Sequence, residues 1–114
     1  MDHQAVVVLI TAPSVDSARE IARSLLEQKL AACANILPGI HSLYLWEDAL
    51  HEDPEALLIV KTRKELFEDG LVPAVLALHP YDLPEIIALP VTAGLPDYLD
   101  WINQVTETQP GGEQ

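Results

Sequence analysis

The residues best suited to chemistry in this sequence lie close together in one segment, residues 78–85. His79, Asp82 and Glu85 bring one imidazole and two carboxylates into seven residues, between a helical pattern and a strand pattern. Imidazole nitrogens and carboxylate oxygens are common ligands of transition metals, and the two prolines of the segment reduce the entropy lost when these side chains are ordered. The pattern predicts a metal site at His79, with Asp82 and Glu85 as further ligands and Cys33 as a soft ligand if the fold brings it near.

Two of these residues also have plain structural explanations. His79 lies at the end of a helical pattern and before a proline, where an imidazolium interacts favourably with the helix dipole, so it is well placed to cap that helix. Cys33 lies among alanines in an extended pattern, which is typical of a small buried apolar side chain. From the sequence, the metal site and the structural roles stay open as alternatives.

The composition restricts the partners of the chain. Its 18 acidic residues against 6 Lys and Arg leave a formal net charge of -12, which disfavours nucleic acid and anionic membranes and attracts cations even without a specific site. A single cysteine allows no intramolecular disulfide and indicates a reducing compartment. No signal-peptide pattern precedes the first apolar run, and no segment reaches the roughly 20 apolar residues that cross a bilayer. We expect a cytoplasmic protein.

The elements that must position the candidate ligands follow from periodicity and its breaks. The expected order is a strand at 5–12, a helix at 15–29, hairpin arms at 31–46 and 50–63, a helical pattern at 64–78, a strand at 85–92 and a C-terminal helix from 95. The first strand is an unbroken apolar run, typical of burial on both faces. Gly70 and Pro73 interrupt the second helical pattern and predict a kinked helix or two short ones.

This order predicts an α+β fold of the ferredoxin-like βαββαβ type, with an extra C-terminal helix and a long β-hairpin. One domain spans residues 1–107, and the polar residues 108–114 are expected to be a disordered tail. Each hairpin arm has about 14 residues, roughly 46 Å, against a diameter of roughly 35 Å for a domain of this length. The arms must bend near Pro38-Gly39 and Pro54, curl over their own core, or overhang the body and meet a partner subunit.

Five separated motifs in this order resemble the CutA family of divalent-cation tolerance proteins over residues 5–105. They are LAACANILPG at 30–39, SLYLWE at 42–47, KT at 61–62, HPY at 79–81 with PEI at 84–86, and YLDW at 98–101. The resemblance implies a ferredoxin-like subunit, a homotrimer held by hairpins and edge strands, and tolerance to copper and other divalent cations. It attaches no reaction to the family, so we do not expect an enzyme.

The resemblance also carries residue roles to this sequence. Some bacterial members are proposed to bind copper through a cysteine of the first strand and histidines beside the Pro-Tyr motif. His79 matches one of them, but Ile10 and Leu78 stand at two other ligand positions. The remaining polar and aromatic family positions are expected to line an intersubunit cleft, in which a lysine receives an anion or pairs with a carboxylate: Tyr44, Trp46, Glu47, Lys61 and Tyr81.

Two functions follow as hypotheses. The first is a trimer that binds copper or another divalent cation and contributes to metal tolerance. The second starts from the family's likeness to the PII signalling proteins: a sensor or adaptor trimer whose intersubunit clefts bind a small anionic ligand or a partner protein.

Overall fold

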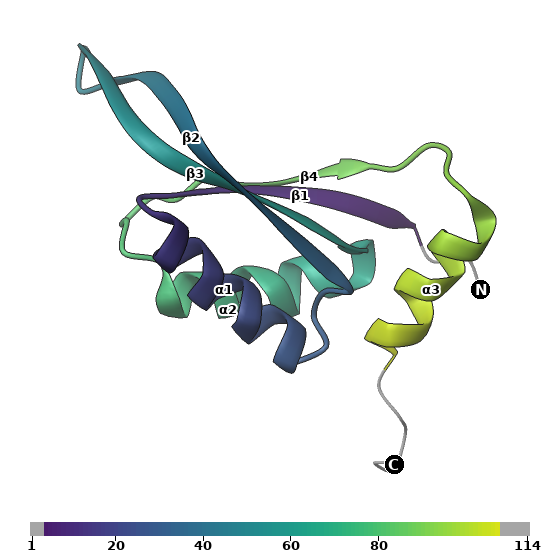
Figure 1. Ribbon diagram of the computed structural model, residues 1–114. Helices are drawn as coiled ribbons and strands as arrows, with labels where there is room; N and C mark the ends of the chain where they lie inside the picture. Colours follow the sequence, from purple (N-terminus) through teal and green to yellow (C-terminus); the bar gives the residue numbers. More distant parts are fainter. Residues whose placement is uncertain (1–3, 108–114) are drawn as a thin grey trace.

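Four strands and three α-helices make up most of residues 4–107, the part of the chain that the computed structural model describes (Figure 1). The elements are β1 (Ala5–Ala12), α1 (Val15–Glu27), β2 (Cys33–Trp46), β3 (Ala49–Arg63), α2 (Val72–Leu78), β4 (Ile86–Pro90) and α3 (Pro96–Thr106). The strands form one sheet in the order β2-β3-β1-β4 with antiparallel neighbours. This confirms the predicted ferredoxin-like α+β fold with its extra C-terminal helix. The predicted tail, 108–114, lies outside the described residues.

The sheet has one covered face and one open face. Helices α1 and α2 lie side by side against the same face (Figure 1), where Val8 and Ile10 of β1 and Leu58 of β3 are fully buried. On the other face Val7 and Leu9 are only half-buried. The prediction that β1 is buried on both faces is therefore wrong for the single chain. On the second face α3 contacts the end of the sheet near Cys33 and Arg63, and it leaves Val7 and Leu9 partly exposed.

Local sequence signals set the ends of α1. Ser14 has an extended backbone, and its hydroxyl accepts a hydrogen bond from the Ser17 amide at 3.0 Å, which satisfies one of the free N–H groups at the helix start. The helix ends at Glu27, two residues earlier than expected, because Lys29 turns into the left-handed region with φ 58°.

The second helical pattern is divided, as Gly70 and Pro73 predict. A 3-10 turn (Lys64–Leu66) leads into a π-helical segment (Phe67–Leu71), and α2 begins only at Val72. Pro73 lies in the first turn of α2, where its missing N–H breaks no hydrogen bond. Gly70 lies against Leu30, since a Cβ added there would come within 2.7 Å of the Leu30 Cδ2 atom.

The β2–β3 hairpin both bends and overhangs. A register shift falls between Leu37 and Ile40, at Pro38 and Gly39, and Gly39 has φ 73°, which glycine adopts without steric cost. Beyond that point the arms leave the body at the end of the sheet opposite α3 (Figure 1), and the chain measures 49 × 29 × 23 Å. The tip turns through Glu47 and Asp48, both with positive φ. The structure excludes the curled alternative.

Candidate functional site

His79 ends α2 and is held by two hydrogen bonds. Its Nε2 lies 2.7 Å from the carbonyl oxygen of Thr11, and its Nδ1 lies 3.2 Å from the amide nitrogen of Tyr81. A carbonyl only accepts, so Nε2 carries the proton and the Nδ1 lone pair accepts the Tyr81 N–H. The side chain is 8% exposed. Both nitrogens are therefore engaged within the chain, and neither offers a lone pair to a metal.

The structure does not gather the predicted metal ligands. Among residues 4–107, no three His, Cys, Asp or Glu side chains lie close enough to share an ion. Asp82 and Glu85 are exposed on the loop after α2, and Cys33 pairs in register with Lys61. The site predicted from His79, Asp82, Glu85 and Cys33 therefore does not form within one chain, because both nitrogens of the histidine are bonded to the backbone of Thr11 and Tyr81 and the cysteine belongs to another part of the sheet.

A different group of polar side chains meets on the hairpin. The Tyr81 hydroxyl donates to Glu55 Oε2 at 2.7 Å, the Tyr44 hydroxyl donates a short hydrogen bond to Asp53, and the Tyr44 ring stacks on His51 at 5.3 Å between centroids. We call Tyr44, His51, Asp53, Glu55 and Tyr81 the hairpin cluster. His51, Asp53 and Glu55 alternate along β3, so the pleat turns all three to one side.

The carboxylates keep the two phenols of the hairpin cluster protonated. Burial, followed by the hydrogen bond to Glu55, raises the pKa of Tyr81 well above its usual value of 10.0. The hydrogen bond to Asp53 raises the pKa of Tyr44. Since ionising either phenol would place a second negative charge beside a carboxylate, both tyrosines stay neutral donors at ordinary pH. The cluster thus presents carboxylate oxygens, the donor type that divalent cations take.

A second polar group lies toward the other end of β3. The Lys61 ammonium donates a short hydrogen bond to the Asn35 amide oxygen, and Cys33 Sγ lies 3.9 Å from the same oxygen. Tyr98 of α3 joins this group, since burial and then the neighbouring Cys33 raise the pKa of its phenol. We call Cys33, Asn35, Lys61 and Tyr98 the sheet cluster. Tyr98 is 40% exposed.

The five predicted cleft residues do not line one cleft in the single chain. Tyr44 and Tyr81 belong to the hairpin cluster, and Lys61 belongs to the sheet cluster. Glu55 and Lys61 are six positions apart on β3, roughly 20 Å at about 3.3 Å per residue. Trp46 is 48% exposed near the hairpin tip, where Glu47 forms the turn.

Sequence reasoning missed His51, Asp53 and Glu55 in the first group and Asn35 in the second. The signal was available in part, because H-x-D-x-E at 51–55 alternates in a predicted strand and so places three polar groups on one face.

The two clusters share the open face of the sheet with an apolar patch. Across the strands, Leu9 pairs with both Ile59 and Ile87, and Val7 pairs with Leu89. Ile87 and Leu89 are each 47% exposed. Side chains alternate between the two faces along β3, so Asp53, Ile59 and Lys61 lie on the same face. The patch therefore lies between the acidic hairpin cluster and the lysine of the sheet cluster. We call these five residues the open-face patch: Val7, Leu9, Ile59, Ile87 and Leu89.

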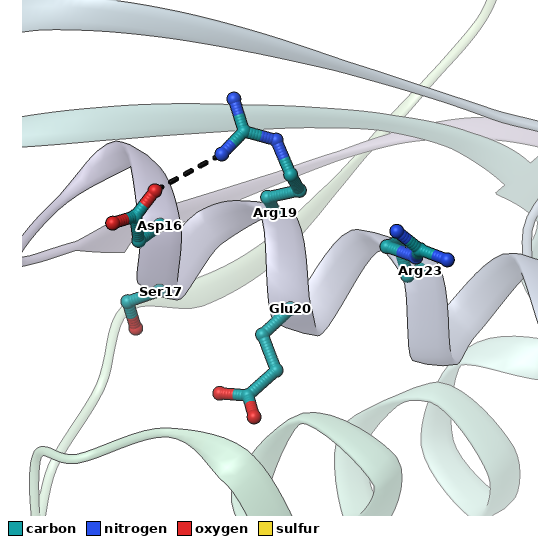
Figure 2. A pocket seen from close by; sticks show the side chains of 5 residues that line it. All are labelled: Asp16, Ser17, Arg19, Glu20 and Arg23. Atoms are coloured by element: carbon teal, nitrogen blue, oxygen red, sulfur yellow. Dashed lines mark hydrogen bonds and ion pairs between the residues drawn. The ribbon is translucent and has the colours of Figure 1, made fainter.

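A shallow pocket on α1 is lined by charged side chains that do not form a candidate site. Figure 2 shows its five lining residues, with Arg19 paired to Asp16 at 3.0 Å one helical turn away. Both side chains are largely in solvent, at 55% and 94% exposure, where such a pair contributes little.

Comparison with known proteins decides the family. The family described as CutA1 divalent ion tolerance protein matches residues 6–105 of the chain. The chain belongs to this family.

Individual CutA proteins are similar to this chain over most of its length. The divalent-cation tolerance protein CutA of Thermus thermophilus is 52% identical over 100 residues, which cover 88% of this chain and 96% of the relative. The chloroplastic CutA of Arabidopsis thaliana is 47% identical over 90% of this chain, but the chain spans only 56% of that protein. The solved Thermus thermophilus CutA1 structure superposes with a TM-score of 0.87 at 50% identity, covering 90% of this chain and 99% of that one.

The family description and the names of the two Thermus thermophilus proteins refer to tolerance of divalent cations, and none of them names a reaction. Among residues 4–107, no helix is long and apolar enough to span a membrane.

Proposed function

We propose that this protein contributes to divalent-cation tolerance in the cytoplasm as a homotrimer that binds copper or another divalent cation. Its membership of the CutA1 family and the names of its relatives support the tolerance role. The trimer and the copper come from the resemblance described above.

The observation that carries the proposal is the open-face patch. Half-exposed Ile87 and Leu89 extend a continuous apolar surface over the sheet, and contiguous exposed apolar surface marks an association site. The hairpin adds Leu43, Leu45 and Leu50, which are 61%, 76% and 70% exposed on arms that reach beyond their own subunit. Copies of the chain that cover one another's open faces would bury both surfaces.

Cation binding is supported by charge and by the hairpin cluster. The net charge of -12 raises the local concentration of cations around the protein, and Asp53 and Glu55 offer carboxylate oxygens on the side of the sheet where subunits would meet. The set centred on His79 does not fit a metal in one chain, since both ring nitrogens are occupied. The proposal therefore places cation binding at the assembled protein, with Asp53 and Glu55 as the residues to test.

The test is a copper titration of the purified oligomer by calorimetry. We expect saturable uptake with a fixed number of ions per subunit. The double variant Asp53→Asn with Glu55→Gln should lower the copper affinity at least about tenfold. Asp97→Asn, an exposed carboxylate at the start of α3, is the matched control and should bind as the wild type does. His79→Gln should leave copper affinity unchanged. Weak, salt-sensitive uptake that is equal in all variants would contradict specific binding and indicate the acidic surface alone.

One observation favours a second function, a PII-like sensor or adaptor. In the sheet cluster, a lysine, an amide and a protonated phenol lie together on the open face, and these groups suit a small anion. Native mass spectrometry of the protein purified without added ligand would show a constant added mass per subunit. Lys61→Met should remove it while the oligomer persists. Loss of the oligomer with the ligand would instead assign Lys61 a structural role.

A further inference from the structure

The outer side of the helical layer has a groove that the proposed function does not use. It lies between α1 and α2, has a volume of about 510 Å³, and falls in the range of ligand-binding clefts. Ser24 and Gln28 line it from α1, and Asp69, Gly70, Ala74 and Ala77 line it from the other side. We call it the α1–α2 groove. The open-face patch lies on the opposite side of the sheet, so assembly through that patch leaves the groove accessible.

Small side chains and an unusual turn form the floor of this groove. Gly70, Ala74 and Ala77 line its α2 side, so another backbone can approach closely there. Gly70 belongs to the π-helical segment Phe67–Leu71, and such segments occur frequently at functional sites. On the α1 side, Gln28 donates to Ser24 at 2.9 Å, so these two polar groups satisfy each other and leave the floor apolar.

The edge of the groove is acidic on balance, because on α1 two carboxylates outnumber Arg23, which lies within one turn of both. Glu20 and Glu27 lie one turn from Ser24 on α1, on the same side of the helix. Figure 2 shows Glu20 directed to the side where α2 lies, while Arg19 points to the opposite side. Asp69 lines the groove from the α2 side. An apolar floor between carboxylates on both edges is complementary to a segment with one apolar stripe and basic flanks.

We propose that the α1–α2 groove binds a short basic amphipathic helix of a partner protein. Its apolar residues, spaced three and four apart, would lie on the floor formed by Gly70, Ala74 and Ala77, as in helix-in-groove recognition. Its Lys and Arg side chains would pair with Glu20, Glu27 and Asp69. This role is independent of metal binding and of the ligand chemistry on the open face.

A pair of synthetic peptides tests this on the assembled full-length protein. The first is a fluorescein-labelled Leu/Lys helix with leucines at helical spacing, and the second replaces every Leu by Gln at the same charge. Fluorescence anisotropy at physiological salt should show saturable binding of the Leu/Lys peptide only. Binding of both peptides with equal affinity, or saturable binding of neither, would overturn the proposal.

Two variants locate the site. Ala77→Trp fills the groove at an exposed position and should lower the affinity for the Leu/Lys peptide at least about tenfold. Leu76→Trp changes a residue exposed on another side of α2 and should keep the wild-type affinity. Glu20→Lys with Glu27→Lys should weaken binding similarly, and Glu52→Lys on the hairpin should not. Thermal unfolding near the wild-type midpoint confirms that each variant folds. Unchanged affinity in the groove variants would overturn the assignment.

Discussion

The two faces of the sheet differ far more in burial than in composition. Adjacent residues of β3 show the contrast, since Leu58 is fully buried under the helices while Ile59 lies on the open face and is only half-buried. Both are large aliphatic side chains on one strand. The difference shows that an aliphatic residue type favours burial. Whether the side chain is buried within one chain depends on whether another element packs over it.

The largest effect is expected on the covered face. Leu58→Ala removes a fully buried side chain of the core and should lower the free energy of unfolding by about 2–5 kcal/mol. Denaturant unfolding monitored by circular dichroism would measure it. The loss should not depend on protein concentration.

On the open face, Ile59→Ala should lower the free energy of unfolding by about 1–2 kcal/mol, because in the proposed oligomer part of its contact area would lie between subunits. Here the loss should grow on dilution, and light scattering during size-exclusion chromatography should show a shift toward smaller species. A concentration-independent loss equal to that of Leu58→Ala would mean that the chain itself covers this face.

The polar end of the open face should give a smaller effect. Tyr81→Phe removes the hydrogen bond to Glu55 and should destabilise the protein by about 1 kcal/mol. Tyr98→Phe is the matched change in the sheet cluster. Equal stability of wild type and Tyr81→Phe would show that the hydrogen bond is replaced by water without loss.

Stability should also fall with rising alkaline pH. The pKa of Tyr81 is raised above its usual 10.0 in the folded protein, so above about pH 10 the unfolded chain releases a proton that the folded chain retains. The stabilisation is therefore complete below pH 10 and decreases above it. Thermal midpoints from pH 8 to 11 should fall less steeply in Tyr81→Phe. A parallel fall in both proteins would assign the loss to other groups.

The smallest effect is expected at the hairpin tip, beyond both faces. Asp48 has φ 64°, a conformation that costs a non-glycine residue energy and that type I′ hairpin turns usually give to glycine. Asp48→Gly should stabilise the protein by about 0.5 kcal/mol, after the extra backbone entropy of glycine in the unfolded chain is subtracted. Differential scanning calorimetry would detect the increase, and a decrease would show that the Asp48 side chain itself stabilises the tip.

Local signals in the sequence predicted most of the fold. Ser14 marks the start of α1, Gly70 and Pro73 mark the divided second helix, and Pro38-Gly39 marks the bend of an overhanging hairpin. These succeed because capping, helix breaking and strand length act over a few residues.

The candidate sites depend on contacts that spacing does not specify. His79 is satisfied by the carbonyl of Thr11, 68 positions earlier in the chain, so its proximity to Asp82 and Glu85 in sequence was misleading. Tyr44 and Lys61 both face the open side, but the length of β3 between them places them in separate clusters. The residue types can be read from the sequence, whereas the strand register determines which of them meet.

The position of β1 in the sheet has a consequence for synthesis of the chain. β1 emerges from the ribosome before the other strands of the sheet, yet it is central, and Pro90, the partner of Val6, follows only after those strands have been made. The β2–β3 hairpin can close locally long before that. A nascent chain therefore displays one unpaired edge of its most apolar strand until β4 arrives, and chaperones that shield extended apolar segments should engage it during that interval.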